Sequence, residues 1–212
     1  RARRFRQHVR THGIVRLATR LVAIMGGPPL RWLSRSRFHR QLCDDDTMNT
    51  LAVAILACVT AQRASEVWLA RRNTERLLAA GGVEHGANHY PVMVALHAAW
   101  LLILWWLAPV REVSLPLLAL YAACQVFRLW ILATLGARWT TRIITVPGER
   151  LVARGPFRFI RHPNYVLVAI EVPLLPLVFN LVAVAAIFAV LNLAMLAWRI
   201  GVENRALGYA RS

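Results

Sequence analysis

From residue 48 onward, apolar residues occur in long runs that short polar segments separate. A helix needs about 20 residues to cross the hydrocarbon core of a bilayer, which is about 30 Å thick. The regions that are long and apolar enough are residues 48–82, 90–110, 113–135 and 165–200. The deeply apolar part of the first region is short, so we expect that helix to continue as an amphipathic stem that ends at Gly81 and Gly82.

The last of these regions is too long for a single crossing. Pro173 and Pro176 interrupt its helical hydrogen bonds, and Asn180 suits a turn. We therefore predict one helix to about residue 178 and a second over residues 181–200. The predicted fold is an all-α integral membrane bundle of about five transmembrane helices, in which the last two form a hairpin after a basic loop.

The composition excludes an ordinary soluble domain, because 58% of the 212 residues are hydrophobic. A formal net charge of +16 would indicate nucleic-acid binding in a polar chain. Here the arginines lie between apolar runs, which indicates contact with anionic lipid headgroups. Membrane lipids are therefore expected partners and nucleic acid is not. The three cysteines and seven histidines show no metal-ligand spacing, so no metal site is predicted.

The arginines also orient the predicted bundle. With five spans, the side that carries the basic loop has many arginines, and the other side has Arg111 alone. The arginine-rich side carries Arg71, Arg72, Arg76, Arg138, Arg142, Arg150, Arg154, Arg158, Arg161, Arg199, Arg205 and Arg211. Because cytoplasmic loops are enriched in basic residues, we predict that the loop and the C-terminus face the cytoplasm, in a bacterial inner membrane.

Residues 1–47 do not fit this orientation, because their 11 arginines precede the first span and would lie on the opposite side. One interpretation is a basic arm on the membrane surface. The other is an extension upstream of a true start at Met48, which would make the segment non-native. We favour the second, and divide the chain into a basic N-terminal extension over residues 1–47 and a transmembrane domain over residues 48–212.

The segment GPFRFIRHPNYVLVAIE, residues 155–171, joins a basic and aromatic loop directly to an apolar helix. Four side chains that can bind a polar small molecule lie within eight positions, namely Arg158, Arg161, His162 and Tyr165. The proline after His162 favours extended backbone at that histidine, which ends the loop at the mouth of the bundle. The alternative interpretation is that the loop arginines only face anionic lipid.

An acid within the following apolar helix favours a binding site, because a carboxylate inside the membrane needs a partner. Asn164 and Glu171 are seven residues apart and share one helix face. On the last helix, Asn192, Arg199 and Glu203 form a second polar stripe. Both stripes lead toward the arginine-rich side, so we predict a pocket between the last two helices that opens to the cytoplasm.

Within this pocket, Arg161 and Glu171 are expected to line one shared cavity.

Arg128 lies close to a helix end, and we expect its guanidinium to extend to the membrane surface. Arg63 and Glu66 are three residues apart on a helix, so an ion pair between them is predicted.

The run GPFRFIRHPNYV, the acid after it and the terminal RIGVENRAL resemble the isoprenylcysteine carboxyl methyltransferase family of integral-membrane methyltransferases. The resemblance covers roughly residues 48–207. Related phospholipid methyltransferases and sterol reductases carry similar C-terminal patterns. The segments HYPVMVALHAAW and RWTTRIITVPG are closer to bacterial members associated with long-chain alkylresorcinol and alkylpyrone products than to the eukaryotic protein-modifying enzymes.

What the resemblance implies is S-adenosylmethionine as the cofactor. The implied cofactor-binding residues are Arg161, His162, Tyr165 and Glu171, and the implied catalytic residues are Arg199 and Glu203. The family commonly has two adjacent glutamates where this chain has Glu203 and Asn204, a departure that concerns the acceptor end of the site.

The predicted function is that of an S-adenosylmethionine-dependent O-methyltransferase that acts on a lipid-like acceptor. A long-chain alkyl phenol is the first choice of acceptor, and a prenylated cysteine carboxylate is the second. The alternatives are a phospholipid or amine N-methyltransferase, an NADPH-dependent reductase of the sterol type, and a non-catalytic membrane adaptor.

Overall fold

The computed structural model describes residues 48–148, 152–206 and 208. The chain divides into two compact units, Arg1–Asp46 and Thr47–Ser212. The first unit lies outside the described residues, and so do the predictions made for residues 1–47.

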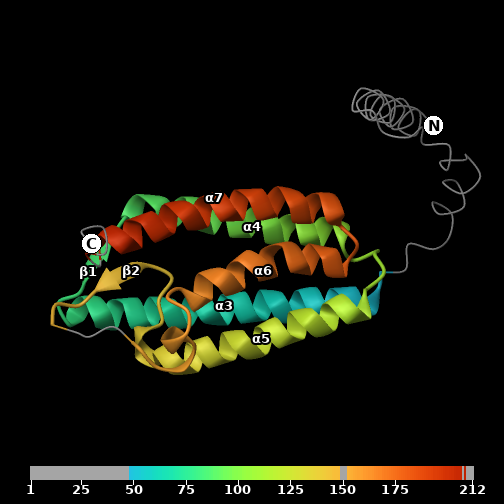
Figure 1. The fold of residues 1–212 in the computed structure, drawn as a ribbon. Coiled ribbons are helices and arrows are strands. Elements are labelled where there is room, and N and C mark those ends of the chain that lie inside the picture. Colours follow the sequence, from blue (N-terminus) through green and yellow to red (C-terminus); the bar gives the residue numbers. More distant parts are fainter. Residues whose placement is uncertain (1–47, 149–151, 207, 209–212) are drawn as a thin grey trace, which may run out of the picture. The chain divides into compact units, whose positions relative to one another are not determined.

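In the described part of the second unit, five α-helices form a bundle (Figure 1). They are α3 (Thr50–Ala79), α4 (Tyr90–Leu107), α5 (Leu115–Leu135), α6 (Pro163–Val178) and α7 (Val182–Ala206). Four of these regions are long and apolar enough to cross a membrane, and α6 is a shorter apolar helix. This arrangement confirms the predicted helical membrane bundle.

The helix ends follow local sequence signals. Asn49 precedes α3, and its side-chain oxygen accepts hydrogen bonds from the backbone N–H groups of Leu51 and Ala52, as an N-cap residue does. At the other turn, α6 continues through Pro173 and Pro176 and ends at Val178. Asn180 then takes a left-handed conformation with φ of 58°, which reverses the chain into α7 as predicted.

Large apolar side chains cover the outside of the bundle, as lipid contact requires. Leu102, Trp106, Val126 and Val190 are all more than two-thirds exposed. The interior is a packed cluster that includes Leu56, Leu104, Leu175 and Phe188 from α3, α4, α6 and α7. Because lipid tails are as apolar as these side chains, close packing rather than removal from water holds this core together.

A two-stranded antiparallel sheet lies at one end of the bundle, a feature that the all-α prediction missed. Strand β1 (Val83–His85) belongs to the α3–α4 connection and β2 (Ile143–Thr145) to the α5–α6 connection, with Glu84 opposite Ile144. The short helices η1 (Ala87–His89), η2 (Gly136–Arg138) and η3 (Gly155–Arg158) lie in the same two connections. The end of α7 and the start of α6 lie at this end too, whereas the α4–α5 and α6–α7 turns lie at the other (Figure 1).

Candidate functional site

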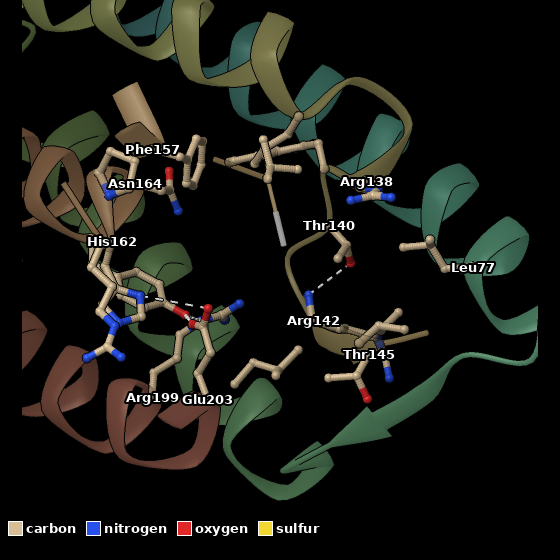
Figure 2. Close-up of a pocket in the computed structure, with 18 of the residues that line it drawn as sticks. Leu77, Arg138, Thr140, Arg142, Thr145, Phe157, His162, Asn164, Arg199 and Glu203 are labelled. Atoms are coloured by element: carbon tan, nitrogen blue, oxygen red, sulfur yellow. Dashed lines mark hydrogen bonds and ion pairs between the residues drawn. The ribbon is translucent and has the colours of Figure 1, made fainter. Parts of the chain in front are cut away.

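A cavity of about 500 Å³ lies at the sheet end of the bundle. One wall comes from η3, the first turn of α6 and the last turns of α7, and it carries most of the polar groups. The residues of this wall are Phe157, Arg161, His162, Pro163, Asn164, Tyr165, Arg199 and Glu203. The facing wall comes from the ends of α3 and α5 and from the segment through β2, including Leu77, Arg138, Trp139, Thr140, Arg142 and Thr145 (Figure 2).

The start of α6 places three polar side chains at the cavity. His162 has a non-helical backbone and Pro163 is the first helical residue, so the helix begins two residues before the predicted start at residue 165. The backbone N–H of Tyr165 then donates to the carbonyl of His162 at 3.0 Å, which closes the first turn. His162, Asn164 and Tyr165 therefore line the cavity from one end of a single helix.

Tyr165 joins this turn to the two charged residues of α7. Its hydroxyl donates to Oε2 of Glu203, and Nε of Arg199 donates to the hydroxyl at 2.9 Å. The His162 ring stacks on the Tyr165 ring with centroids 5.3 Å apart, and its Nδ1 lies 3.8 Å from Oε1 of Glu203. The structure thus brings Arg161, His162, Tyr165, Arg199 and Glu203 to a single cavity.

Glu171 is not part of this cavity, so the prediction that it shares one with Arg161 is wrong. Its side chain is 1% exposed and faces α3 and α5 instead. Arg128 donates to both of its oxygens through Nε and Nη2, Arg63 Nη2 donates to Oε2 at 3.0 Å, and Gln125 Nε2 donates to Oε1 at 2.9 Å. The physical reason is that a carboxylate inside the membrane must be paired with a cation. The guanidinium groups of Arg63 and Arg128 already pair with Glu171, so this carboxylate does not require a ligand.

Arg128 is 2% exposed, so the prediction that it extends to the membrane surface is also wrong. Glu66 accepts from Arg63 at 2.9 Å, which confirms that predicted ion pair, and from Arg128 at 3.3 Å. Gln62 donates to both Glu66 and Gln125 and completes the set. We call these six residues, Gln62, Arg63, Glu66, Gln125, Arg128 and Glu171, the polar network; its two arginines and two glutamates balance in formal charge.

The second predicted stripe is only partly at the cavity. Arg199 and Glu203 line it, but Asn192 is buried deeper in the bundle, where its Nδ2 donates to the carbonyl of Val168 at 3.3 Å. On the first stripe, Asn164 lines the cavity and Glu171 belongs to the polar network.

The comparison with family models matches residues 117–209 to the isoprenylcysteine carboxyl methyltransferase family. This region contains nearly all of α5, the basic connection, α6 and α7, and hence the whole polar wall of the cavity. The chain belongs to the isoprenylcysteine carboxyl methyltransferase family. Membership of this family makes the protein a methyltransferase. Its long apolar helices make it an integral membrane protein.

A relative in Bacillus subtilis (strain 168), the uncharacterized protein YpbQ, is 34% identical over 163 residues. The alignment covers 72% of this chain and 94% of the relative. No solved structure gives a significant match. An alignment over 72% of this chain is longer than the family match over residues 117–209. The similarity to this relative therefore also includes helices α3 and α4.

This family member has site residues on the facing wall that sequence reasoning did not single out. Arg142 lines the cavity, donates to both oxygens of Glu84 at 2.8 Å, and lies 4.4 Å from the centre of the Tyr90 ring. His85 and Thr145 are 2.8 Å apart across the two strands. The signal available in the sequence was the run of β-branched residues in TTRIITV, a composition that is typical of a strand.

Three side chains at the cavity each have a buried polar atom with no hydrogen-bond partner among the described residues. These atoms are His162 Nε2, Asn164 Oδ1 and Trp139 Nε1. Leaving such a group unpaired costs about 1–3 kcal/mol. A polar ligand in this methyltransferase's cavity would satisfy them.

Gly155 determines how closely the loop before α6 approaches α5. Its φ is +57°, and an added Cβ would lie 2.5 Å from Oγ1 of Thr134. We expect Gly155→Ala to lower the free energy of unfolding by about 1–3 kcal/mol, because the loop must move away from α5. Thermal unfolding in detergent measures this, with Gly148→Ala as the matched control, since Gly148 has φ of +79° but nothing within 4 Å of the added atom. Equal losses in both variants would contradict a role for the contact.

Proposed function

We propose that the protein is an S-adenosylmethionine-dependent O-methyltransferase whose acceptor is a lipid-like molecule. The observation that carries the proposal is the set of unpartnered buried polar atoms in a cavity that also holds cations and an acid. The cavity volume of about 500 Å³ lies within the range of small-molecule sites, about 300–1,000 Å³.

The residues present fit this cofactor, which has a carboxylate, an ammonium group, an adenine ring and a sulfonium. Arg161 offers a guanidinium for a carboxylate. His162 Nε2 and Asn164 Oδ1 offer buried polar atoms, of which the asparagine oxygen accepts from an N–H donor. Trp139 and Phe157 offer aromatic surface in the same lining. When bound, S-adenosylmethionine supplies an electrophilic methyl group.

Arg199 and Glu203 are the proposed catalytic residues. A phenolic acceptor needs a base to take its proton, which Glu203 provides, and a carboxylate acceptor needs a cation to place it, which Arg199 provides. Methyl transfer to oxygen requires in-line approach, so holding the acceptor oxygen in place supplies much of the acceleration. A long-chain alkyl phenol remains our first choice of acceptor and a prenylated cysteine carboxylate the second.

The position of the cavity suits an acceptor with a long apolar tail. The cavity lies where apolar helices end, and its lining combines Leu77, Leu135 and Ile143 with the charged groups. Such an acceptor would keep its tail in the bilayer while its polar head enters the site. We propose that this end faces the cytoplasm of a bacterial cell, because the arginines of the α5–α6 connection lie here.

The test is direct binding of S-adenosylmethionine to the full-length protein in detergent or nanodiscs, by isothermal titration calorimetry. We expect binding by the wild type and an increase in Kd of about tenfold for His162→Ala and for Asn164→Ala, the size of one lost hydrogen bond. Asn180→Gly is the control, because Asn180 lies at the other end of the bundle and glycine suits its left-handed backbone. No binding at millimolar cofactor, or binding of NADPH in its place, would overturn the proposal.

A further inference from the structure

Tyr165 stands between the two charged side chains of α7 that line the cavity. Arg199 and Glu203 are four residues apart on one helix, a spacing at which opposite charges normally pair directly. Among the described residues, however, Glu203 forms no direct ion pair with Arg199, and its Oε1 lies 3.8 Å from Nδ1 of His162. The tyrosine hydroxyl occupies the position between them, receiving from Arg199 Nε and donating to Glu203 Oε2.

The chemistry of a phenol determines the direction of this bridge. A tyrosine hydroxyl has a single proton, which goes to the carboxylate, and its oxygen lone pairs accept from the guanidinium. Both charged groups therefore keep their charges while each makes a hydrogen bond to a neutral atom. A phenylalanine ring at this position fills the same space without either bond.

The remaining contacts hold the two groups in definite orientations. Nη1 of Arg199 lies 2.9 Å from Sδ of Met93 on α4, and the arginine is 7% exposed. With Oε2 engaged by Tyr165, the other carboxylate oxygen of Glu203 is the one directed toward His162, at 3.8 Å from Nδ1. Oε2 is thus used for positioning, whereas Oε1 faces the ring of His162, which also lines the cavity.

We propose that Tyr165 is a positioning residue that keeps Arg199 and Glu203 from pairing with each other, so that Oε1 of Glu203 takes the proton of the acceptor. The acceptor O–H bond breaks, an O–H bond forms at Oε1, and the electron pair stays on the acceptor oxygen. This inference rests on the proposed function. It changes the role of Tyr165 from the cofactor ligand that the sequence implied to a support for the catalytic pair.

The experiment compares wild type, Tyr165→Phe and the matched control Tyr90→Phe as full-length proteins in nanodiscs. Tyr90 lies outside the cavity lining, and its hydroxyl accepts from Thr141 at 3.3 Å. S-adenosylmethionine binding is measured by calorimetry, and turnover is measured with 5-pentadecylresorcinol and with N-acetyl-S-farnesylcysteine. The ¹⁵Nε–¹Hε NMR signal of Arg199, assigned by its loss in Arg199→Lys, reports the bridge without any acceptor.

For Tyr165→Phe we expect a kcat lower by about 10- to 100-fold, less than the roughly 10²- to 10⁴-fold contribution of the base itself because Glu203 is still present, and a cofactor Kd within about twofold of wild type. The Arg199 Nε–H signal should shift, since its acceptor is gone, and Tyr90→Phe should leave all three measurements unchanged. An unshifted Arg199 signal would overturn the inference whether or not either acceptor is turned over. A raised cofactor Kd with unchanged kcat in Tyr165→Phe would also overturn the inference, because it would make Tyr165 a ligand of the cofactor. Failure of the wild type to bind S-adenosylmethionine would instead reject the proposed function.

Discussion

Glu171→Gln is expected to destabilise the protein by about 3–5 kcal/mol, the cost of removing one partner from a buried ion pair. The carboxylate accepts from Arg63, Gln125 and Arg128 and is 1% exposed. A glutamine amide at this site accepts through one oxygen only and directs an N–H group at the arginines. The substitution also leaves the polar network with one uncompensated positive charge. Thermal unfolding in detergent, followed by tryptophan fluorescence, should show a Tm lower by about 10 °C.

Two further variants separate charge balance from simple side-chain loss. Glu171→Gln combined with Arg128→Gln restores neutrality, since Arg63 and Glu66 still pair, and should be more stable than Glu171→Gln alone. Glu112→Gln alters an exposed carboxylate in the α4–α5 turn and should leave Tm unchanged. A Glu171→Gln protein as stable as wild type would show that these groups do not form the polar network.

Glu203→Gln is expected to lower kcat by about 10²- to 10⁴-fold with a phenolic acceptor, the usual contribution of a positioned base. The amide retains the size of the side chain and can still accept from Tyr165, so the cavity should keep its shape. Its nitrogen cannot take up a proton from the acceptor. We therefore expect the Kd of S-adenosylmethionine to stay within about twofold of wild type, with the loss confined to turnover.

The control for this variant is Glu75→Gln, which changes an exposed carboxylate on α3 and should leave turnover intact. Radiolabelled methyl transfer from S-adenosylmethionine, at saturating cofactor, measures kcat for both proteins. A loss of less than threefold for Glu203→Gln would remove Glu203 from the catalytic role. A large increase in cofactor Kd with unchanged kcat would instead make it part of the cofactor site.

The helices of this methyltransferase could be predicted closely from sequence. Helices α4, α5 and α6 each begin within two residues of the predicted start, because proline lies in the first turn of each. The α6–α7 turn followed from Asn180, whose short polar side chain tolerates left-handed backbone. Each of these helix ends is determined by residues within one turn of it, so the sequence alone is enough to predict them.

The cavity was partly predictable for a similar reason. His162 and Tyr165 lie within one turn of the same helix, and Arg199 and Glu203 lie one turn apart on another. Helical spacing was enough to place each pair on a face. The two-stranded sheet was not predictable in this way, because three-residue strands in connections far apart in the chain have too little periodic signal.

Sequence alone was sufficient to establish that the chain is a membrane-embedded helical bundle. It also placed a basic loop, which ends at a proline, before an apolar helix that contains an acid. These properties depend only on hydrophobicity and local backbone preference. The sequence also showed that Glu171 needs a partner. Only the tertiary structure decided which partner it has, because Arg63 and Arg128 come from α3 and α5 and no spacing relates them to α6. A charge in a low-dielectric interior pairs with the cation that packing brings closest, and packing of helices distant in the chain is a property of the whole fold.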